Sequence, residues 1–340
     1  MNIINKITKI FFKNNNFQNI NTTTYIPNEE KNEIKSTFKP VKFLEKYKNM
    51  DDGISNSLAS LHQDDKISIV VKGTTLGDSA GRPFEGWWSS EEIETKIDNT
   101  GLYDEINEIT DDTALTWAIL SGLRNKTDEE TYEESFKNEL YKYGFKYTTF
   151  GYGPGFITWL YSGKQEPYNS YGNGSAMRVS SCGCFDNIDD VIEIAKLSAM
   201  PTHNHPEGIK GAVVTAVCIW MAFNGATKED IYEYALEQYS PEEYEVKINV
   251  PLQNQHYAKS TYLTCQGTIP RAIRAFYESK DYEDCIRKAI LIGGDTDTQA
   301  AIAGSIASAS YKNFNNESNI VYEKILNKYK KEQEILGIKG

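Results

Sequence analysis

Cysteine is scarce in this chain, and its few cysteines follow no disulfide pattern. They are Cys182, Cys184, Cys218, Cys265 and Cys285. Small domains held together by disulfides are dense in cysteine and carry even numbers of it, whereas here 5 cysteines are scattered over 340 residues. This usage excludes a disulfide framework and favours a reducing compartment.

Basic charge and long apolar runs are also in short supply. The chain has 36 lysines and arginines against 48 aspartates and glutamates, which gives a formal net charge of −12. A protein held to nucleic acid by phosphate contacts needs a basic surface, so we expect no direct nucleic-acid partner. The small-residue run 300–309 is too short to cross a bilayer, which needs roughly 20 apolar residues. We therefore expect no membrane partner, and a monomer in the cytoplasm is the simplest interpretation.

Strand-like alternation of apolar and polar residues is rare as well. Over 66–332, apolar residues recur at the three-and-four spacing of helices with one buried face, for example at Val213, Val217 and Trp220. The pattern is long enough for one large core. It favours a mainly helical domain over 66–332.

Residues 1–65 show no such pattern and are rich in Asn, Lys, Ile and Thr. We interpret them as a low-complexity, partly disordered extension. Its first stretch places Ile3, Ile7 and Ile10 on one helical face among lysines, but without arginine. Two interpretations stay open, an organelle-targeting helix or a frayed or locally docked tail. At the other end, 333–340 is predicted to be a charged tail.

Two acid-rich segments each come directly before a predicted helix. Thr110-Asp111-Asp112-Thr113 precedes the apolar run 114–120, and Gly293-Gly294-Asp295-Thr296-Asp297-Thr298 precedes the small-residue run 300–308. Free backbone amides and the helix dipole favour acids in a first helical turn, so either segment alone could be a simple cap. Two segments of one design, with four carboxylates between them, favour a shared role.

Four carboxylates gathered in a folded protein repel one another unless they are protonated or neutralised by a cation. Oxygen-only ligands select magnesium, manganese or calcium over zinc, and two ions about 3.5–4 Å apart can share a water and bind a diol. A zinc site is the alternative, because C-x-C at 182–184 and H-x-H at 203–205 offer suitable atoms. Sequence spacing does not decide whether the two acidic segments meet in space.

Six fragments, in this order, carry a resemblance to a known family. They are VKGTTLGDSAGRPFEG (71–86), TDDTALTWAIL (110–120), GYGPG (151–155), SYGNGSAMRV (170–179), THNHPEGIKGA (202–212) and IGGDTDTQAAIAGSIA (292–307). Over 67–309 the chain resembles the ADP-ribosylglycohydrolase family, which includes dinitrogenase-reductase-activating glycohydrolases and ADP-ribosyl-acceptor hydrolases. The resemblance implies a compact all-α domain of orthogonally packed helices with a two-metal cleft.

The resemblance assigns residues to a metal centre. Those that match metal ligands are Thr110, Asp111, Asp112, Asp295, Asp297 and Thr298. The implied cofactor is a pair of Mg²⁺ ions, with Mn²⁺ as a substitute. The implied catalytic residues are Asp112, Asp297 and Glu85. Glu85 resembles a glutamate that approaches the metals and could take a proton from the attacking water, and the alternative is a surface or cap-forming glutamate. Asp78 is expected to anchor a turn between two glycines.

Another set of positions matches contacts to ADP-ribose. They are Gly151, Gly153, Gly155, Ser170, Tyr171, Asn173 and His203. In the glycine loop 151–155, backbone amides can approach a pyrophosphate closely, although the same residues suit an ordinary tight turn. Arg178 is predicted either to pair with a site carboxylate or to contact the substrate.

The predicted function is magnesium-dependent removal of ADP-ribose from a modified acceptor, a protein or a small conjugate, by hydrolysis of an N- or O-glycosidic bond at the distal ribose. Two alternatives stay open. One is a non-catalytic ADP-ribose reader or crystallin-like protein of the same fold, and the other is a metal-dependent nucleotide pyrophosphohydrolase. Thr74, Thr75 and Gln299 stand where the family usually has small apolar or aliphatic residues.

Overall fold

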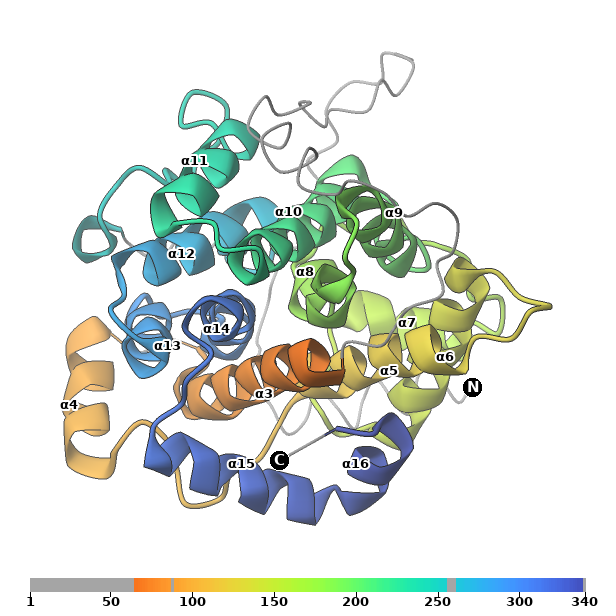
Figure 1. Ribbon diagram of the computed structural model, residues 1–340, viewed down its shortest axis with the longest axis horizontal. Helices are drawn as coiled ribbons and strands as arrows, with labels where there is room; N and C mark the ends of the chain where they lie inside the picture. Colours follow the sequence, from red (N-terminus) through yellow and green to blue (C-terminus); the bar gives the residue numbers. More distant parts are fainter. Residues whose placement is uncertain (1–63, 87–88, 256–260, 339–340) are drawn as a thin grey trace, which may run out of the picture. The chain divides into compact units, whose positions relative to one another are not determined.

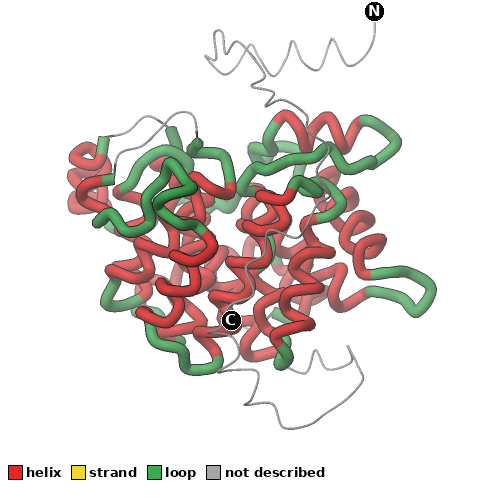
Figure 2. Tube along the Cα trace, turned by 90° about the horizontal axis from the view of Figure 1, so that it is seen from above, coloured by secondary structure: helices red, strands yellow, loops and turns green. Residues whose placement is uncertain are grey.

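The computed structural model describes residues 64–86, 89–255 and 261–338. Throughout these ranges the chain forms helices joined by loops, with no β-strand and only isolated backbone bridges (Figure 2). This confirms the predicted all-α class. The interpretations of the N-terminal segment, including a targeting helix, fall outside the described residues, apart from Asp64 and Asp65 at the start of the first described helix.

The helices follow one another with short connections (Figure 1). The α-helices are α3 (Asp64–Gly81), α4 (Ser90–Thr100), α5 (Asp111–Asn125), α6 (Tyr132–Lys146), α7 (Pro154–Tyr161), α8 (Gly174–Met177), α9 (Ile188–Ala199), α10 (Pro206–Phe223), α11 (Lys228–Gln238), α12 (Cys265–Glu278), α13 (Tyr282–Leu291), α14 (Thr296–Tyr311), α15 (Asn316–Lys328) and α16 (Lys330–Leu336). Three short 3₁₀ helices lie between them, η1 (Arg82–Phe84), η2 (Ser180–Cys184) and η3 (Leu252–Asn254).

The closest packing in the domain is between α3 and α14. Glycines at a spacing of four residues line the face of α3 that meets α14, and they allow backbone-to-backbone contact. A Cβ added to Gly77 would lie 2.2 Å from the carbonyl oxygen of Ala300, and one on Gly81 would lie 2.4 Å from that of Thr296. Any larger side chain would force the helices apart. The small residues predicted to permit close packing do so.

The same interface corrects one local prediction. Asp78 does not anchor a turn between glycines, because the segment around it is the last part of the 18-residue helix α3. The glycines at 73, 77 and 81 are interface residues of that helix rather than turn residues. As a result, Asp78 is fully buried at the C-terminal end of α3, beside the start of α14.

α10 is the described helix that is long and apolar enough to cross a membrane, judged by length and composition alone. Of its residues, 78% are buried in the domain, where it packs against α9 and α14. The core helix of a globular domain passes the same test. The small-residue run 300–309 lies in α14, and α10 is longer than that run.

The chain ends in two helices, α15 and α16, which meet at Tyr329. The predicted charged tail, 333–340, overlaps α16, which continues to Leu336. Leu336 and Ile338 are both buried, at 0% and 4% exposure. Apolar side chains at these two positions therefore attach the end of the described chain to the core.

All five cysteines are free and buried, which agrees with the absence of a disulfide framework. Burial raises the pKa of each thiol, to about 12 for Cys182, Cys265 and Cys285. The pKa values of Cys184 and Cys218 are raised by burial in the same direction. These thiols pack as small apolar groups rather than as nucleophiles.

Candidate metal centre

The two acidic segments are the N-termini of α5 and α14. Thr110 is the N-cap of α5 and its side chain accepts a hydrogen bond from the Asp112 amide, so the two acids that follow lie in the first turn. Asp295 precedes α14, whose first turn contains Asp297. Gly293 and Gly294 have φ values of 76° and 84°, a conformation that favours glycine. The glycine pair thus turns the chain sharply into α14.

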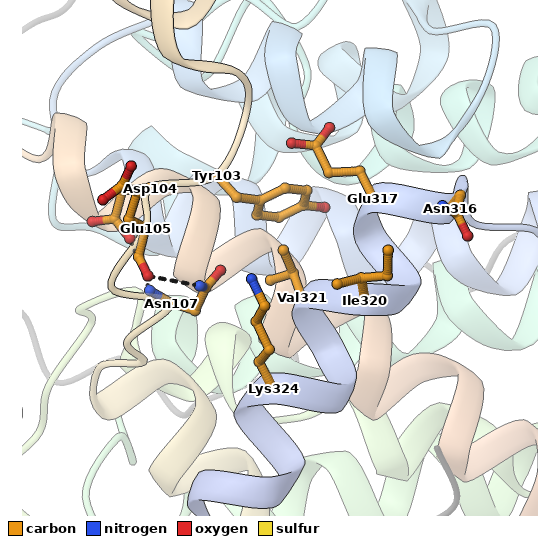
Figure 3. Close-up of a pocket in the computed structure, with 9 residues that line it drawn as sticks. All are labelled: Tyr103, Asp104, Glu105, Asn107, Asn316, Glu317, Ile320, Val321 and Lys324. Atoms are coloured by element: carbon orange, nitrogen blue, oxygen red, sulfur yellow. Dashed lines mark hydrogen bonds between the residues drawn. The ribbon is translucent and has the colours of Figure 1, made fainter.

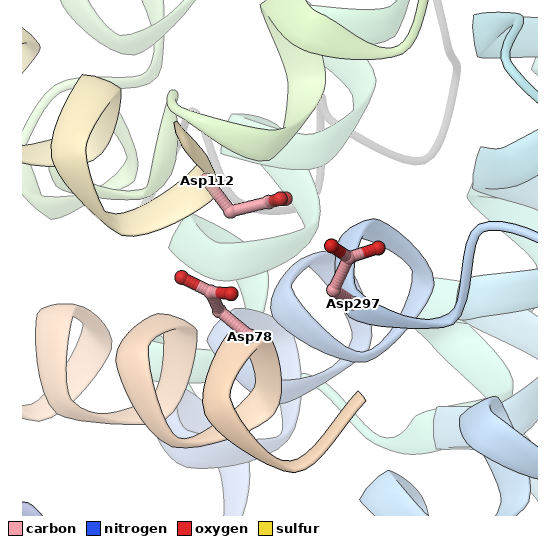
Figure 4. Close-up of side chains that lie close together, drawn as sticks. All are labelled: Asp78, Asp112 and Asp297. Carbon is pink, nitrogen blue, oxygen red and sulfur yellow. The ribbon is translucent and has the colours of Figure 1, made fainter. Parts of the chain in front are cut away.

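The structure brings the two segments together. Carboxylate oxygens of Asp78, Asp112 and Asp297 all lie within 4.8 Å of one another (Figure 4). A second group, made by Glu85, Asp295 and Asp297, meets the same limit. Asp297 belongs to both groups, so the two candidate ion positions are neighbours. The Thr298 hydroxyl donates to Asp112 Oδ2 at 3.3 Å and links α14 to α5 directly.

The aspartates of these groups are buried without a compensating cation, whereas Glu85 is exposed. Within the described ranges, no lysine or arginine forms an ion pair with them, and Asp112 Oδ1 is buried without a hydrogen-bond partner. Burial, and then the neighbouring carboxylates, raise the pKa values of Asp112 and Asp297 well above their usual range. Like charges held this close favour either protonation or a divalent cation. The donor set, which is oxygen only, fits Mg²⁺ or Mn²⁺.

Asp78 has a larger role than the sequence suggested. Its carboxylate accepts from the amides of Thr110 and Thr113, at 2.9 and 3.1 Å, and from both of their hydroxyls. It therefore fixes the N-terminus of α5 against α3. It is also a member of the first carboxylate group, which the expected turn-anchoring role did not include.

Glu85 reaches the second carboxylate group through a backbone contact. The Gly86 amide donates to the Gly294 carbonyl at 2.9 Å, which places the segment after η1 beside the turn before α14. The charge of Asp297, burial and the charge of Asp78 together raise the pKa of Glu85 to about 7. A carboxyl group with this pKa can gain or lose a proton near neutral pH.

Asp111 lies beside these groups rather than inside them. It is half-buried, and burial and the charge of Asp297 raise its pKa well above the usual range. Its amide donates to the Phe150 carbonyl at 3.1 Å. A Cβ added to Gly151, whose φ is 87°, would lie 4.0 Å from Asp111 Oδ1. The glycine loop therefore borders the acidic cluster, and Gly151, Gly153 and Gly155 are all exposed there.

The segment 170–174 joins the cluster from another side. Asn173 is buried, and its Nδ2 donates to Asp295 Oδ2 at 2.5 Å and to Thr268 Oγ1 at 3.0 Å. Tyr171 is 47% exposed, and its ring lies 5.1 Å from that of His205. The Ser170 hydroxyl accepts from the Gly172 amide at 3.1 Å. Residues predicted to contact ADP-ribose thus share one region with the carboxylates.

Two possibilities that the sequence left open are not observed. Arg178 neither pairs with a site carboxylate nor reaches the surface, because it is fully buried and donates to the Ser198 carbonyl and the Thr202 hydroxyl. The zinc alternative also fails, because both candidate metal groups among the described residues consist of carboxylates, and neither includes a thiol or an imidazole.

Gln299 supports the candidate metal centre, a role that its departure from the family pattern did not suggest. It is buried, and its Nε2 donates to the carbonyls of Gly293 and Asp295 at 2.8 and 3.1 Å. These bonds hold the turn that presents Asp295. An aliphatic side chain at this position could not make them.

Two hollows lie near the surface of the described domain. One, of about 410 Å³, is lined by Gly155, Trp159, Lys164 and Tyr168, among others. Because Gly155 belongs to the glycine loop, this hollow adjoins that loop. The other, of about 330 Å³, lies between Tyr103 and α15, with Lys324 and Ile320 on its wall (Figure 3). It contains none of the predicted site residues.

Comparison with known proteins identifies the family of this chain. The ADP-ribosylglycohydrolase family model matches residues 59–313. ADP-ribosylhydrolase ARH3 of Mus musculus is 27% identical over 259 residues, covering 59% of this chain and 69% of the relative. The protein of the same name from Bos taurus is 25% identical over 315 residues, covering 71% and 83%. The chain belongs to the ADP-ribosylglycohydrolase family.

A solved structure shows the same fold. It is described as an ADP-ribosylglycohydrolase-related protein complex, and it covers 81% of this chain and 97% of its own, with a TM-score of 0.58 and 21% sequence identity. At this identity the likeness concerns the fold alone.

Proposed function

We propose that this protein is a magnesium-dependent hydrolase that removes ADP-ribose from a modified acceptor by cleaving the glycosidic bond at the distal ribose. Family membership supports ADP-ribosyl hydrolase activity in general. The observation that carries the finer proposal is the pair of carboxylate groups that share Asp297 and have no cation partner within the described residues. Such a site retains the means for catalysis, which disfavours a reader or a crystallin-like protein.

The residues present fit two divalent ions. Asp112, Asp297 and the hydroxyls of Thr110 and Thr298 would serve one position, and Asp295 would serve the other with Asp297. When bound, Mg²⁺ would supply Lewis-acid polarisation and make a water more acidic. Mn²⁺ takes the same oxygen ligands.

The chain's own groups account for the remaining requirements of the reaction. Glu85, with a pKa of about 7, would accept a proton from the attacking water. The surrounding carboxylates favour the positive charge that develops on the ribose in an oxocarbenium-like transition state. Asn173 and the exposed Tyr171 border the space for the ligand, and the open backbone of the glycine loop suits a pyrophosphate.

A panel of defined substrates tests this proposal. Proteins and small conjugates carrying ADP-ribose on arginine, on serine, as a polymer, on an acetyl ester or on a nucleic-acid end would be incubated with the full chain, with Mg²⁺ or with a chelator. Mass spectrometry should show free ADP-ribose and the unmodified acceptor only with Mg²⁺. Release of AMP would indicate a pyrophosphohydrolase, and ADP-ribose binding without release from any substrate would indicate a reader.

The location of the reaction is part of the same proposal. We infer a cytoplasmic site of action, because five free, buried cysteines suit a reducing compartment. Imaging of the full chain with a C-terminal tag should show diffuse cytoplasmic signal. Accumulation in an organelle that depends on residues 1–13 would instead favour the targeting interpretation.

A further inference from the structure

Arg178 is a buried cation without an anionic partner among the described residues. Its side chain is 0% exposed, and Nη2 donates to the Ser198 carbonyl at 3.0 Å and to Thr202 Oγ1 at 2.9 Å. Nε and Nη1 have no hydrogen-bond partner within the described part of the chain. Burial lowers the pKa of Arg178 to about 10, which leaves it charged at neutral pH. An unpaired buried charge costs free energy, so its retention calls for a role.

The Thr202 hydroxyl connects Arg178 to His203 through two hydrogen bonds. Thr202 Oγ1 lies 2.7 Å from His203 Nδ1. A guanidinium only donates, so Oγ1 accepts from Arg178, and its single proton is left for His203 Nδ1. The opposite arrangement, with Nδ1–H donating to Oγ1, would leave the proton of a fully buried hydroxyl without an acceptor among the printed contacts of Thr202. The favoured arrangement therefore places the imidazole hydrogen on Nε2.

His203 Nε2 faces the segment predicted to bind the ligand. A Cβ added to Gly174 would lie 3.2 Å from Nε2, and one on Gly172 would lie 3.6 Å away, so both glycines leave room in front of this nitrogen. The ring of Tyr168 lies beside that of His203, with their centroids 6.2 Å apart. Its pKa is raised to about 12 by burial, so it adds no charge at neutral pH.

Protonation of His203 is opposed by its surroundings. The ring is 5% exposed, and burial, with the charge of Arg178, lowers the pKa of His203 well below the usual value. No carboxylate forms an ion pair with His203 among the described residues. The neutral form is therefore kept through the physiological range.

We propose that Arg178 is a positioning residue which, through Thr202, holds His203 as the neutral Nε2–H tautomer, a fixed hydrogen-bond donor presented to the ligand at 170–174. The ligand atom it selects is an acceptor, such as a phosphate or hydroxyl oxygen, because a donor group facing Nε2–H would leave two hydrogens opposed. The ligand identity rests on the proposed function, whereas the tautomer does not.

Nitrogen-15 NMR of the full chain tests the tautomer without any turnover. The chain has 4 histidines, and His203→Asn identifies the signals of this ring by their loss. Long-range proton–nitrogen correlations should show an unprotonated Nδ1 and a protonated Nε2 that do not change between about pH 5.5 and 8. An Nδ1–H tautomer, or conversion to the cation within this range, would overturn the inference.

Thr202→Val then removes the hydroxyl at nearly constant volume. We expect the His203 ring to lose its single tautomer, ADP-ribose affinity to fall about tenfold, and KM to rise more than kcat falls. Thr202→Ser should restore all three. The matched control is Thr215→Val, because Thr215 is also fully buried and its hydroxyl has no partner among the residues that the structure describes. An unchanged His203 spectrum in Thr202→Val would contradict the proposed positioning of His203 through Thr202.

The two readouts separate this inference from the proposed function. If the chain does not bind or release ADP-ribose but His203 is the fixed Nε2–H tautomer, the positioning of His203 by Arg178 and Thr202 is supported and the proposed substrate is wrong. If the enzyme is active but His203 becomes a cation between about pH 5.5 and 8, the proposed positioning of His203 is wrong and the proposed function is unaffected. Arg178→Lys, which keeps the charge but loses the planar fork, should disturb the tautomer even where the variant stays folded.

Discussion

Two buried regions of this domain carry charge of opposite sign, and each lacks the usual partner. At the start of α5 and α14, carboxylates gather without a basic residue to pair with them, and at Arg178 a guanidinium is enclosed without an acid, within the residues that the structure describes. A direct salt bridge would have satisfied both. Keeping them separate leaves the first region free for cations and the second free to direct hydrogen bonds.

The most severe test of this comparison is to remove the carboxylate that both candidate metal groups share. Asp297→Asn should reduce turnover about a thousandfold or more, since several kcal/mol of transition-state stabilisation depend on bound ions. The metal-free variant should be more stable than the metal-free wild type, because one member of a repelling set is gone. Initial rates and thermal melts with and without Mg²⁺ measure both effects.

A surface carboxylate provides the control for that experiment. Asp98→Asn alters an exposed residue that pairs with Arg287 at 2.7 Å, and it should change neither turnover nor Mg²⁺ response. If Asp297→Asn kept full activity in the presence of a chelator, the metal-centred mechanism would be refuted.

The second experiment tests whether the packing of α3 against α14 holds the acidic region in place. Gly77→Ala should destabilise the fold by about 1–3 kcal/mol or more, because its Cβ would collide with backbone of α14 rather than with a flexible side chain. Displacement of α14 should also weaken Mg²⁺ binding. Gly153→Ala, where a Cβ meets nothing within 4 Å, is the matched stability control. Urea unfolding of both variants gives the comparison, and equal stabilities would show that the interface can relax.

The third experiment addresses the cationic region. Arg178→Met should cost about 1–2 kcal/mol, the scale of the lost hydrogen bonds to Ser198 and Thr202, since no ion pair is broken. Removing one partner of a true buried pair costs about 3–5 kcal/mol. Denaturant midpoints distinguish the two, and a loss of the larger size would mean that Arg178 does have an anionic partner.

The smallest effect concerns the pH dependence of the metal-free protein. The pKa of Glu85 in the folded state, about 7, lies above its ordinary value of 4.5. The fold therefore favours the protonated form, and this contribution to stability is present below about pH 4.5 and is lost as pH rises through about 7. Unfolding free energy should fall over that window, less steeply in Glu85→Gln. Identical pH profiles would show that Glu85 does not have a raised pKa.

Much of the fold, and the place of each acidic segment at the start of a helix, followed from local patterns, whereas the meeting of the two segments did not. Helical periodicity and first-turn acids are properties of neighbouring residues, so the sequence displays them directly. The four-residue spacing of Gly73, Gly77 and Gly81 was also visible, and it would have indicated a helix interface instead of a turn. The resemblance to a family added the ligand positions, whose catalytic roles stay predictions.

What the sequence did not reveal depends on contacts between distant segments. Asp78 becomes a candidate ligand only because α3 packs along α14, and Glu85 reaches the cluster only through the contact between Gly86 and Gly294. The environment of Arg178 is set by residues 20 and 24 positions further along the chain. Such proximities follow from the whole packing arrangement rather than from any one motif.

The five enclosed cysteines give this protein a built-in reporter of opening. Each thiol is inaccessible and has a raised pKa in the folded state, so a thiol-directed reagent reacts only with molecules in which part of the core has come apart. The rate of alkylation therefore measures how often each helix releases its cysteine. Cys285 lies in α13 and Cys218 in α10, so labelling site by site would map which parts of the domain open first and whether Mg²⁺ slows them.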